Sequence, residues 1–138
     1  MYRIAINGFG RIGRNIVRAL YERPELQDKI KLVAINDLGS LEISAHLLQF
    51  DTVHGRFNQD VQVTDNSIII NGDVVNWSSE RNPAELPWSD LDVDLVCECT
   101  GVFTSREKAA LHIEAGAKKV IISAPAKDED ITVVIGVN

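Results

Sequence analysis

The feature that most constrains this chain is a glycine loop between an apolar run and an amphipathic segment. Gly8, Gly10 and Gly13 follow the run Tyr2–Ile6, and apolar residues then recur at helical spacing as far as Leu20. Three glycines occur by chance in many sequences, so the pattern is informative only because it joins a strand to a helix. In this context it predicts a strand, a tight turn, and a helix whose amino end faces the turn.

Each glycine has a distinct role in such a loop. Gly8 permits the tight turn, Gly10 lets a pyrophosphate approach the backbone, and Gly13 lets the helix pack closely on the strand. The free N–H groups and the dipole at the helix amino end favour a phosphate, by about 0.3–1 kcal/mol for a charge there. Asp37 ends the second apolar run, Lys31–Ile35, close to the roughly 20-residue spacing of a carboxylate that binds ribose hydroxyls.

The same carboxylate indicates which dinucleotide fits. It would repel a 2′-phosphate, and no arginine lies in Leu38–Leu41 to bind one, so NAD is favoured over NADP. Asp37 has an alternative role as a cap for the following loop, but Ser40 already offers a cap to a helix over Leu41–Gln49. A methyltransferase uses a similar loop and acidic residue, so these two features alone do not name the cofactor class.

The rest of the chain alternates strand and helix patterns. On the first helix, Arg18 falls outside the apolar stripe and is expected on another face. Between residues 59 and 78, alternating apolar residues and the pair Asn71-Gly72 predict an antiparallel meander. The prediction is an α/β fold of the Rossmann type, a doubly wound, mostly parallel sheet with a small antiparallel meander insertion, in one domain over residues 1–138. After the first helix, the remaining expected elements are strands at Lys31–Ile35, Asp94–Glu98, Lys119–Ile122 and Ile131–Ile135, and helices at Leu41–Gln49 and Ser105–Ala115.

The net charge and the positions of the cysteines and histidines limit the kinds of partner that the chain is expected to bind. The net charge of −6 argues against a nucleic-acid partner. No run nears the roughly 18 apolar residues of a membrane span, and no signal peptide precedes the first strand. Cys97 and Cys99 are expected to be reduced structural thiols of a cytoplasmic protein. We expect no metal site, because His46, His54 and His112 are scattered, and His46 and His112 are interpreted as surface or packing residues.

Five segments, in order and across essentially the whole chain, resemble phosphorylating glyceraldehyde-3-phosphate dehydrogenases. They are Ile6–Arg14, Ala34–Asp37, Asp51–Phe57, Glu98–Phe103 and Ala115–Pro125. This resemblance implies that the chain is the NAD-binding domain of such an enzyme. It also implies a homotetrameric parent.

The resemblance implies roles for single residues. Arg11 and Ile12 would present backbone N–H groups to the pyrophosphate, and Asn7 would lie beneath the adenosine. Arg81 would contact the adenine end, and Ser123 would face the nicotinamide side. His54 and Arg56 are expected to shape a loop rather than to react. Together, the expected cofactor-binding residues are Asn7, Gly8, Phe9, Gly10, Arg11, Ile12, Gly13, Asn36, Asp37, Arg81, Thr100, Gly101, Phe103 and Ser123.

No catalytic residue is expected within the chain. The family's nucleophile is a cysteine in a Ser-Cys-Thr-Thr-Asn segment shortly after the position of Gly136–Asn138, and a histidine further on assists it; neither is present. Cys97 and Cys99 lack those flanks, and Glu98 between them disfavours a thiolate. We therefore expect the chain to bind NAD, while a phosphorylated aldehyde is held by a catalytic domain outside it.

Two alternatives stay open at this point. Erythrose-4-phosphate dehydrogenase, a sister enzyme, is resembled by Arg14–Glu22 and Ser105–Glu107, whereas Ser123–Lys127 and Asp37 favour the glyceraldehyde enzyme. The second alternative is a stand-alone NAD-binding module without catalysis. Such a module would cover its apolar surface, whereas a domain that normally packs on a partner domain would expose it.

Overall fold

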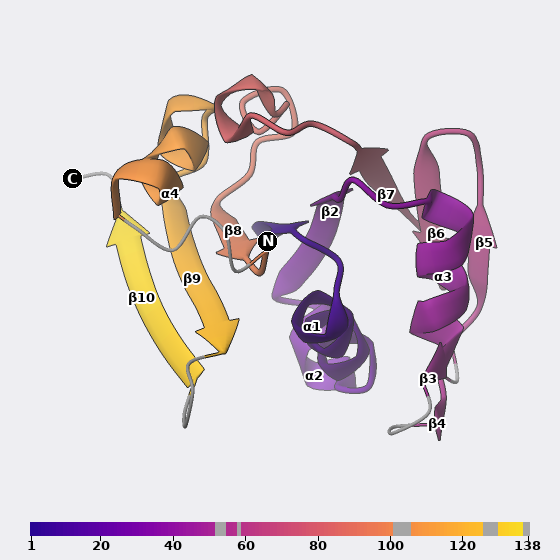
Figure 1. The fold of residues 1–138 in the computed structure, drawn as a ribbon. Helices are drawn as coiled ribbons and strands as arrows, with labels where there is room; N and C mark the ends of the chain where they lie inside the picture. Colours follow the sequence, from indigo (N-terminus) through magenta and orange to yellow (C-terminus); the bar gives the residue numbers. More distant parts are fainter. Residues whose placement is uncertain (52–54, 58, 101–105, 126–129, 137–138) are drawn as a thin grey trace.

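Helices and strands alternate along the chain in the computed structural model, which describes residues 1–51, 55–57, 59–100, 106–125 and 130–136 (Figure 1). Each helix and strand expected from the sequence is present, although Ser105, the expected first residue of the helix over Ser105–Ala115, lies outside the described residues; α2, β3, β4 and the 3₁₀ turn η1 were not expected. In chain order the elements are β1 (Tyr2–Asn7), α1 (Arg11–Tyr21), α2 (Pro24–Gln27), β2 (Ile30–Asn36), α3 (Leu41–Gln49), β3 (Phe50–Asp51), β4 (Gly55–Arg56), β5 (Val61–Val63), β6 (Ser67–Ile70), β7 (Asp73–Ser78), η1 (Pro83–Glu85), β8 (Leu95–Glu98), α4 (Arg106–Glu114), β9 (Lys119–Pro125) and β10 (Asp130–Gly136).

One eight-stranded sheet organises the molecule, in the order β10-β9-β8-β1-β2-β7-β6-β5, while β3 and β4 pair separately. The five central strands β9, β8, β1, β2 and β7 are parallel to one another. From β1 the chain builds outward through β2 and β7 on one side, then returns to build through β8 and β9 on the other. The doubly wound Rossmann-type prediction is therefore confirmed, with a switch point between β1 and β8.

The antiparallel meander is continuous with this sheet. The turn between β6 and β7 has Asn71 at φ 51° and Gly72 at φ 88°. Two successive left-handed residues match the twist of the flanking strands, which is why an Asn-Gly pair favours a two-residue hairpin. The last strand, β10, runs antiparallel to β9, which its apolar pattern does not reveal.

Side chains alternate between two core clusters, one on each face of the sheet. Ile4 and Ile6 of β1 pack with Val17 of α1 and Leu48 of α3. Ala5, between them, belongs to the second cluster, on the face that α4 covers. This alternation holds β1 between two apolar layers, as expected of a central parallel strand.

Arg18 corrects the simple picture of α1 as an amphipathic helix. The helical pattern places it off the apolar stripe, yet the side chain is only 4% exposed. Its Nη2 and Nε donate to the Leu48 carbonyl oxygen at 2.7 and 3.1 Å, and its guanidinium lies over the Phe57 ring. Arg18 therefore binds carbonyl oxygens at the carboxyl end of α3, where the helix leaves them without internal partners.

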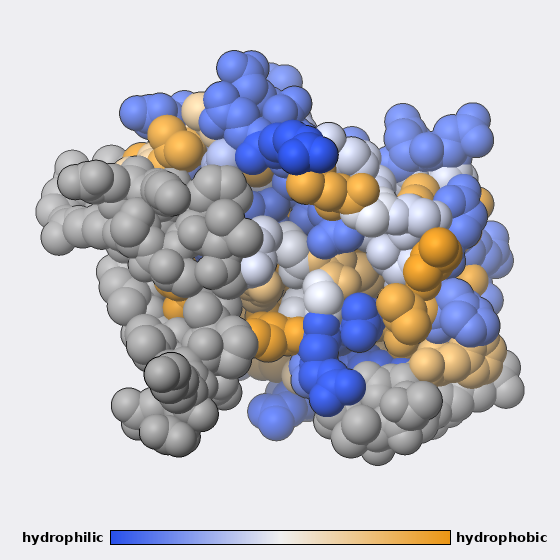
Figure 2. Space-filling view, viewed as in Figure 1, coloured by the Kyte–Doolittle hydropathy of each residue, from blue (hydrophilic) through white to orange (hydrophobic). Residues whose placement is uncertain are grey.

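The outer side of α3 remains apolar. Ile43, Leu47 and Phe50 are exposed, and Figure 2 shows apolar side chains over α3. Among the described helices, none combines the length and the apolar character that a membrane crossing requires.

Candidate functional site

A cavity of about 490 Å³ lies at the carboxyl ends of β1, β2 and β8, at the switch point of the sheet. Open α/β sheets bind their ligands at such points. The expected residues that line this cavity are Asn7, Gly8, Gly10, Asn36, Asp37, Arg81 and Thr100. Sequence reasoning missed three further lining residues, Leu38, Glu80 and Cys99, although each of them adjoins an expected residue.

Gly8 and Gly13 are required by packing within the protein. Gly8 has a φ of +94°, and a Cβ there would lie 2.7 Å from the Thr100 backbone nitrogen. A Cβ on Gly13 would lie 2.4 Å from the Gly8 carbonyl oxygen. These contacts confirm the tight turn at Gly8 and the close packing of α1 on the turn that follows β1 at Gly13.

Gly10 differs from both. A Cβ built on Gly10 meets nothing within 4 Å among the described residues, although Gly10 is the N-cap of α1 and lines the cavity. Packing within the protein therefore does not explain why this position is glycine. A glycine that lines open space is suited to the close approach of a ligand.

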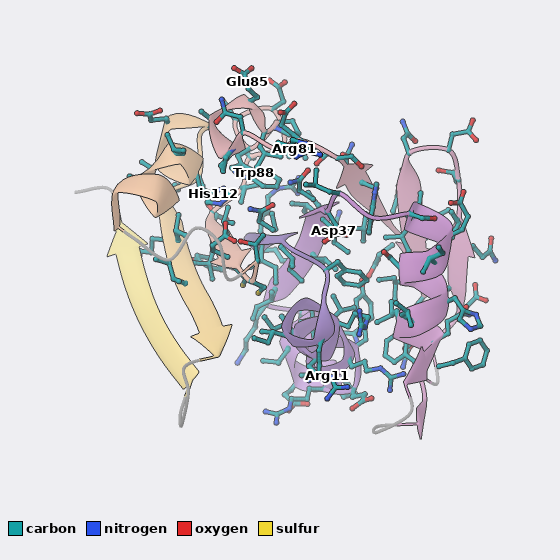
Figure 3. All side chains as sticks on the ribbon, viewed as in Figure 1. Arg11, Asp37, Arg81, Glu85, Trp88 and His112 are labelled. Carbon is teal, nitrogen blue, oxygen red and sulfur yellow. The ribbon has the colours of Figure 1, made fainter. Side chains whose placement is uncertain are left out.

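The amino end of α1 presents unpaired backbone donors beside Gly10. The helix has no side-chain cap and no acidic residue in its first turn, and its internal bonding begins with Arg14 N donating to the Gly10 carbonyl oxygen at 2.9 Å. The N–H groups of Arg11 and Ile12 precede that bond and have no acceptor within the helix. The Arg11 side chain is exposed and lies over α1, away from Asp37 and Arg81 (Figure 3). Backbone N–H groups rather than this side chain therefore face the space at the amino end of α1.

Asp37 connects the glycine loop to the end of β2. One carboxylate oxygen accepts from the Phe9 backbone nitrogen at 2.8 Å, and the other accepts from the Gly39 nitrogen at 2.9 Å. Asp37 is half-buried and lines the cavity. The carboxylate therefore stabilises both loops, as the loop-capping alternative expects, while it also lines the cavity.

Phe9, an expected binding residue, contributes its backbone only. Its side chain is 2% exposed and packs edge-on against Trp77, with ring centroids 5.9 Å apart. It belongs to the core cluster beneath α1 and does not line the cavity. The apolar ring gains free energy from this burial, so only the backbone of Phe9 faces Asp37 and the cavity.

Two asparagines at the ends of β1 and β2 join the loops around the cavity. Asn36 Nδ2 donates to Asn7 Oδ1 at 2.7 Å, and Asn36 Oδ1 accepts from the Glu80 backbone nitrogen at 2.8 Å. This bond fixes the segment that carries Arg81, which is exposed at the edge of the cavity. The amide pair thus orients three chain segments toward one space.

Behind Asn7 and Thr100 lies a buried polar network that the sequence did not indicate. Glu98 and His112 are 1% and 0% exposed, and His112 Nε2 lies 2.5 Å from Glu98 Oε2. Burial alone would raise the pKa of Glu98, but hydrogen bonds from His112, Thr100 and Asn7 hold this pKa below its usual range. His112 is indeed a packing residue, but its polar contacts were missed because its partner lies on a different element.

Neither cysteine is suited to act as a nucleophile. Both are free, and burial raises the pKa of Cys97 to about 11. Burial, with the added charges of Cys97 and Glu98, raises the pKa of Cys99 to about 12. The thiols therefore stay protonated at neutral pH, which agrees with their interpretation as structural.

Several expected residues fall outside what the structure describes. His54, Gly101 and Phe103 lie outside the described residues, and so does the side chain of Ser123, whose backbone belongs to β9. His46 is exposed, and its ring lies 4.9 Å from Phe50. Within the described ranges, no group of His, Cys, Asp and Glu is arranged to hold a metal ion.

Comparison with known proteins gives consistent matches along the chain. A family model described as glyceraldehyde 3-phosphate dehydrogenase, NAD binding domain, matches residues 2–106. A glyceraldehyde-3-phosphate dehydrogenase of Thermotoga maritima is 57% identical over 138 residues, covering 100% of this chain and 41% of the relative. The chromosomal glyceraldehyde-3-phosphate dehydrogenase of Cupriavidus necator is 58% identical over 99% of this chain and 40% of the relative. The chain thus spans about 40% of the length of the curated relatives that it matches.

Proposed function

Because the chain belongs to the glyceraldehyde 3-phosphate dehydrogenase family, as its NAD-binding domain, we propose that the cavity at the ends of β1, β2 and β8 holds the NAD. In this proposal the diphosphate lies over the backbone N–H groups of Arg11 and Ile12. Asp37 binds the adenine ribose, and Arg81 lies at the adenine end. Residues 1–138 act as one cofactor-binding domain.

The observation that carries this proposal is the open space at Gly10. A Cβ there meets no described atom of the protein, while the N–H groups of the first turn of α1, which have no acceptor within the helix, lie directly beside it. A glycine in that setting is explained by a diphosphate that approaches the backbone closely. Its position beside Asp37 in one cavity supports binding of both the diphosphate and the ribose.

The proposed preference for NAD over NADP follows from the charge of Asp37. Both oxygens of this carboxylate are already oriented by backbone donors, so it cannot swing aside without losing them. A ribose hydroxyl can donate to it, whereas a 2′-phosphate would meet a like charge. Leu38–Leu41 provides no arginine to offset that repulsion.

The remaining expected residues complete the proposed pocket. Thr100, Gly101 and Phe103 line the wall beyond β8, and Ser123 faces the nicotinamide side. Support for these four comes from the family resemblance and, for Thr100, from its place in the cavity lining. Asn7 and Asn36 orient the loops from beneath.

For the whole enzyme, we infer oxidative phosphorylation of glyceraldehyde 3-phosphate to 1,3-bisphosphoglycerate, as in glycolysis. The phosphorylated aldehyde and the nucleophile are held outside residues 1–138, and the whole enzyme is a homotetramer. NAD accepts the hydride when it is bound, and this chain contributes binding and orientation. The free Cys97 and Cys99 support a reducing, cytoplasmic location.

The variant Gly10→Ala tests the proposed site. Its methyl group meets no described protein atom, so the melting temperature should fall only slightly, as expected when alanine replaces glycine at an N-cap. It would occupy the space of the diphosphate, so we expect calorimetry to show an NAD affinity at least about tenfold lower, since overpacking costs about 1–3 kcal/mol.

Gly72→Asn is the matched control. Gly72 also has open space around it, but it lies in the β6–β7 turn, where asparagine tolerates the positive φ. This control should bind NAD as the wild type does. Equal affinity in Gly10→Ala and the wild type, or no binding of NAD by the wild type, would contradict the proposal.

A further inference from the structure

We propose that His112 is a positioning residue of the cofactor cavity. As a neutral imidazole with its proton on Nε2, it holds the buried Glu98 carboxylate, which in turn fixes Asn7 and Thr100 at the cavity floor. The inference rests on the proposed NAD site, since it explains what holds the residues of that site in place. His112 and Glu98 lie behind the cavity lining, whereas Asn7 and Thr100 belong to it.

A continuous chain of hydrogen bonds connects the interior to the cavity. Trp88 Nε1 donates to His112 Nδ1 at 3.0 Å, and His112 Nε2 lies 2.5 Å from Glu98 Oε2. Asn7 Nδ2 donates to the same oxygen at 2.7 Å. Thr100 donates to Glu98 Oε1 from its backbone nitrogen at 3.0 Å and from its hydroxyl at 2.6 Å. Figure 3 shows Trp88 and His112 side by side at α4.

Trp88 determines which nitrogen of His112 carries the proton. An indole N–H donates and never accepts, so His112 Nδ1 must be the acceptor and must carry no hydrogen. The proton of the neutral ring is therefore on Nε2, where it donates to Glu98. In a doubly protonated ring, the Nδ1–H group of His112 would face the indole N–H group of Trp88, and neither could accept. Glu98 accordingly carries the charge of the buried pair, and His112 serves as a neutral donor.

Because Glu98 is buried, its hydrogen-bond donors determine where its carboxylate can lie. A buried carboxylate is costly unless hydrogen bonds satisfy its oxygens. The donors to Glu98 come from β1, from α4 and from the end of β8. The carboxylate can therefore satisfy its oxygens only in one position, and that position defines where these segments meet.

The position of Thr100 matters because the glycine loop rests on it. A Cβ on Gly8 would lie 2.7 Å from the Thr100 nitrogen and 2.8 Å from its Cγ2, so the two turns are already in close contact. A shift of Thr100 would displace the Gly8 turn, and with it the amino end of α1. Asn7 also donates to Glu98, and it accepts a hydrogen bond from Asn36. Asn36 in turn donates to the Glu80 carbonyl oxygen, in the segment that carries Arg81.

The variant Glu98→Gln tests the proposal with almost no change of volume. Whichever way the new amide is oriented, its NH₂ group faces either the Thr100 backbone N–H or the donors His112 and Asn7. We expect NAD affinity to fall at least about tenfold, the scale of an unsatisfied buried group. Asp94→Asn is the matched control, because Asp94 accepts from Arg3 and Lys118 at the opposite end of β8. It should leave NAD affinity unchanged.

A second substitution separates this positioning role from general loss of structure. Trp88→Phe removes the indole N–H, so His112 becomes free to carry its proton on Nδ1 and to accept at Nε2. It should therefore partly restore NAD affinity when it is combined with Glu98→Gln. A merely structural role predicts that the two losses multiply. A double variant whose loss equals that product within about twofold would overturn the proposal.

Nitrogen-15 spectroscopy of the His112 ring provides a readout that does not depend on NAD. At neutral pH the wild type should show a protonated Nε2 and an unprotonated Nδ1, and Trp88→Phe should lose this single tautomer. A cationic ring, or a proton on Nδ1 in the wild type, would overturn the proposal even if NAD binds as expected. If the tautomer is as stated and NAD does not bind to the wild type, the proposed function fails instead.

Discussion

Some residues beside the cavity contribute their backbone rather than their side chain. Phe9 buries its ring against Trp77 and offers only its N–H, which Asp37 accepts at 2.8 Å. Asp37 also accepts from Gly39. The Asp37 carboxylate thus stabilises the loop beside the proposed ribose site. A substitution of Asp37 should therefore affect both NAD binding and stability, and the two effects can be measured separately.

Asp37→Ala should weaken NAD binding by about 1–3 kcal/mol, because a charged hydrogen bond to the ribose is lost. It should also lower the melting temperature, since Phe9 and Gly39 lose their acceptor. Asp37→Asn keeps one carbonyl oxygen but removes the charge that repels a 2′-phosphate, so its affinity for NADP should rise relative to that for NAD. Calorimetry with both dinucleotides measures each effect, and an unchanged preference in Asp37→Asn would exclude Asp37 from the ribose site.

Arg18 gives a prediction about stability alone. Arg18→Met keeps much of the apolar stem but leaves the Leu48 carbonyl oxygen, which accepts at 2.7 Å, without its donor. We expect the free energy of unfolding in urea to fall by about 2–3 kcal/mol, as for hydrogen bonds from charged groups. The exposed Arg23 supplies the control Arg23→Met, for which a change within about 0.5 kcal/mol is expected. Equal changes in the two variants would contradict this role for Arg18.

The sequence predicted the roles of residues that act within one strand, turn and helix. It did not predict the roles of residues whose hydrogen-bond partners lie far away in the chain. Gly8, Gly13 and Asp37 follow from the geometry of one strand, turn and helix, and the structure places them together. Arg18 and His112 are polar residues on helices, where periodicity predicts exposure. Their partners lie on α3 and on β8, and no spacing along the chain encodes such pairs.

At the scale of elements, the packing of α1 against β1 and the following turn brings the amino end of α1 close to the cavity. At Gly13 α1 touches β1 and the turn that follows it, since a Cβ there would lie 3.1 Å from Ile6 Cγ2 and 2.4 Å from the Gly8 carbonyl oxygen. That oxygen belongs to the backbone, so no flexible side chain can move away. The amino end of α1 can therefore stand close to the cavity only while this position is glycine.

Gly13→Ala should destabilise the protein although it improves helix propensity. Alanine is favoured over glycine by about 1 kcal/mol inside a helix, but overpacking costs about 1–3 kcal/mol, and a 2.4 Å contact with backbone makes the second effect the larger. Urea unfolding should show a net loss of stability. A gain would show that α1 does not pack on β1 as described, and Gly10→Ala serves as the reference without a clash.

The strand pairings were predictable to different degrees. Asn71 and Gly72 both adopt positive φ, so their identities encode the β6–β7 hairpin directly. The direction of β10 was not predictable, because an apolar strand reads the same in either direction and its partner β9 is equally apolar. The short α2, which begins at Pro24, was not predicted from the sequence.

At the scale of the whole molecule, the strand order locates the cavity. Five central parallel strands bring Asn7, Asn36 and Thr100 to one edge of the sheet, at the ends of β1, β2 and β8. The repeated strand–helix rhythm predicted this arrangement, because right-handed crossovers leave few other topologies. The cluster beneath it, with Glu98 at its centre, appears only when β1, β8 and α4 are assembled.

The buried carboxylate predicts how the stability of the fold depends on pH. Burial alone would raise the pKa of Glu98, but the hydrogen bonds from His112, Thr100 and Asn7 lower it below the ordinary 4.5. A lowered folded pKa contributes stability that is fully present above 4.5 and is lost as the pH falls through the folded value. Urea unfolding between about pH 7 and pH 3 should show this loss, less steeply in Glu98→Gln than in the wild type. An equal slope in both would contradict the ionised state of Glu98.

The central claim is that one cavity seats a diphosphate on the first turn of α1 and a ribose on Asp37. A crystal structure of the chain with NAD tests it most directly. We predict the diphosphate oxygens within hydrogen-bonding distance of the Arg11 and Ile12 nitrogens, and the adenine ribose hydroxyls within hydrogen-bonding distance of the Asp37 carboxylate. A nucleotide bound elsewhere, or a diphosphate remote from Gly10, would contradict the account.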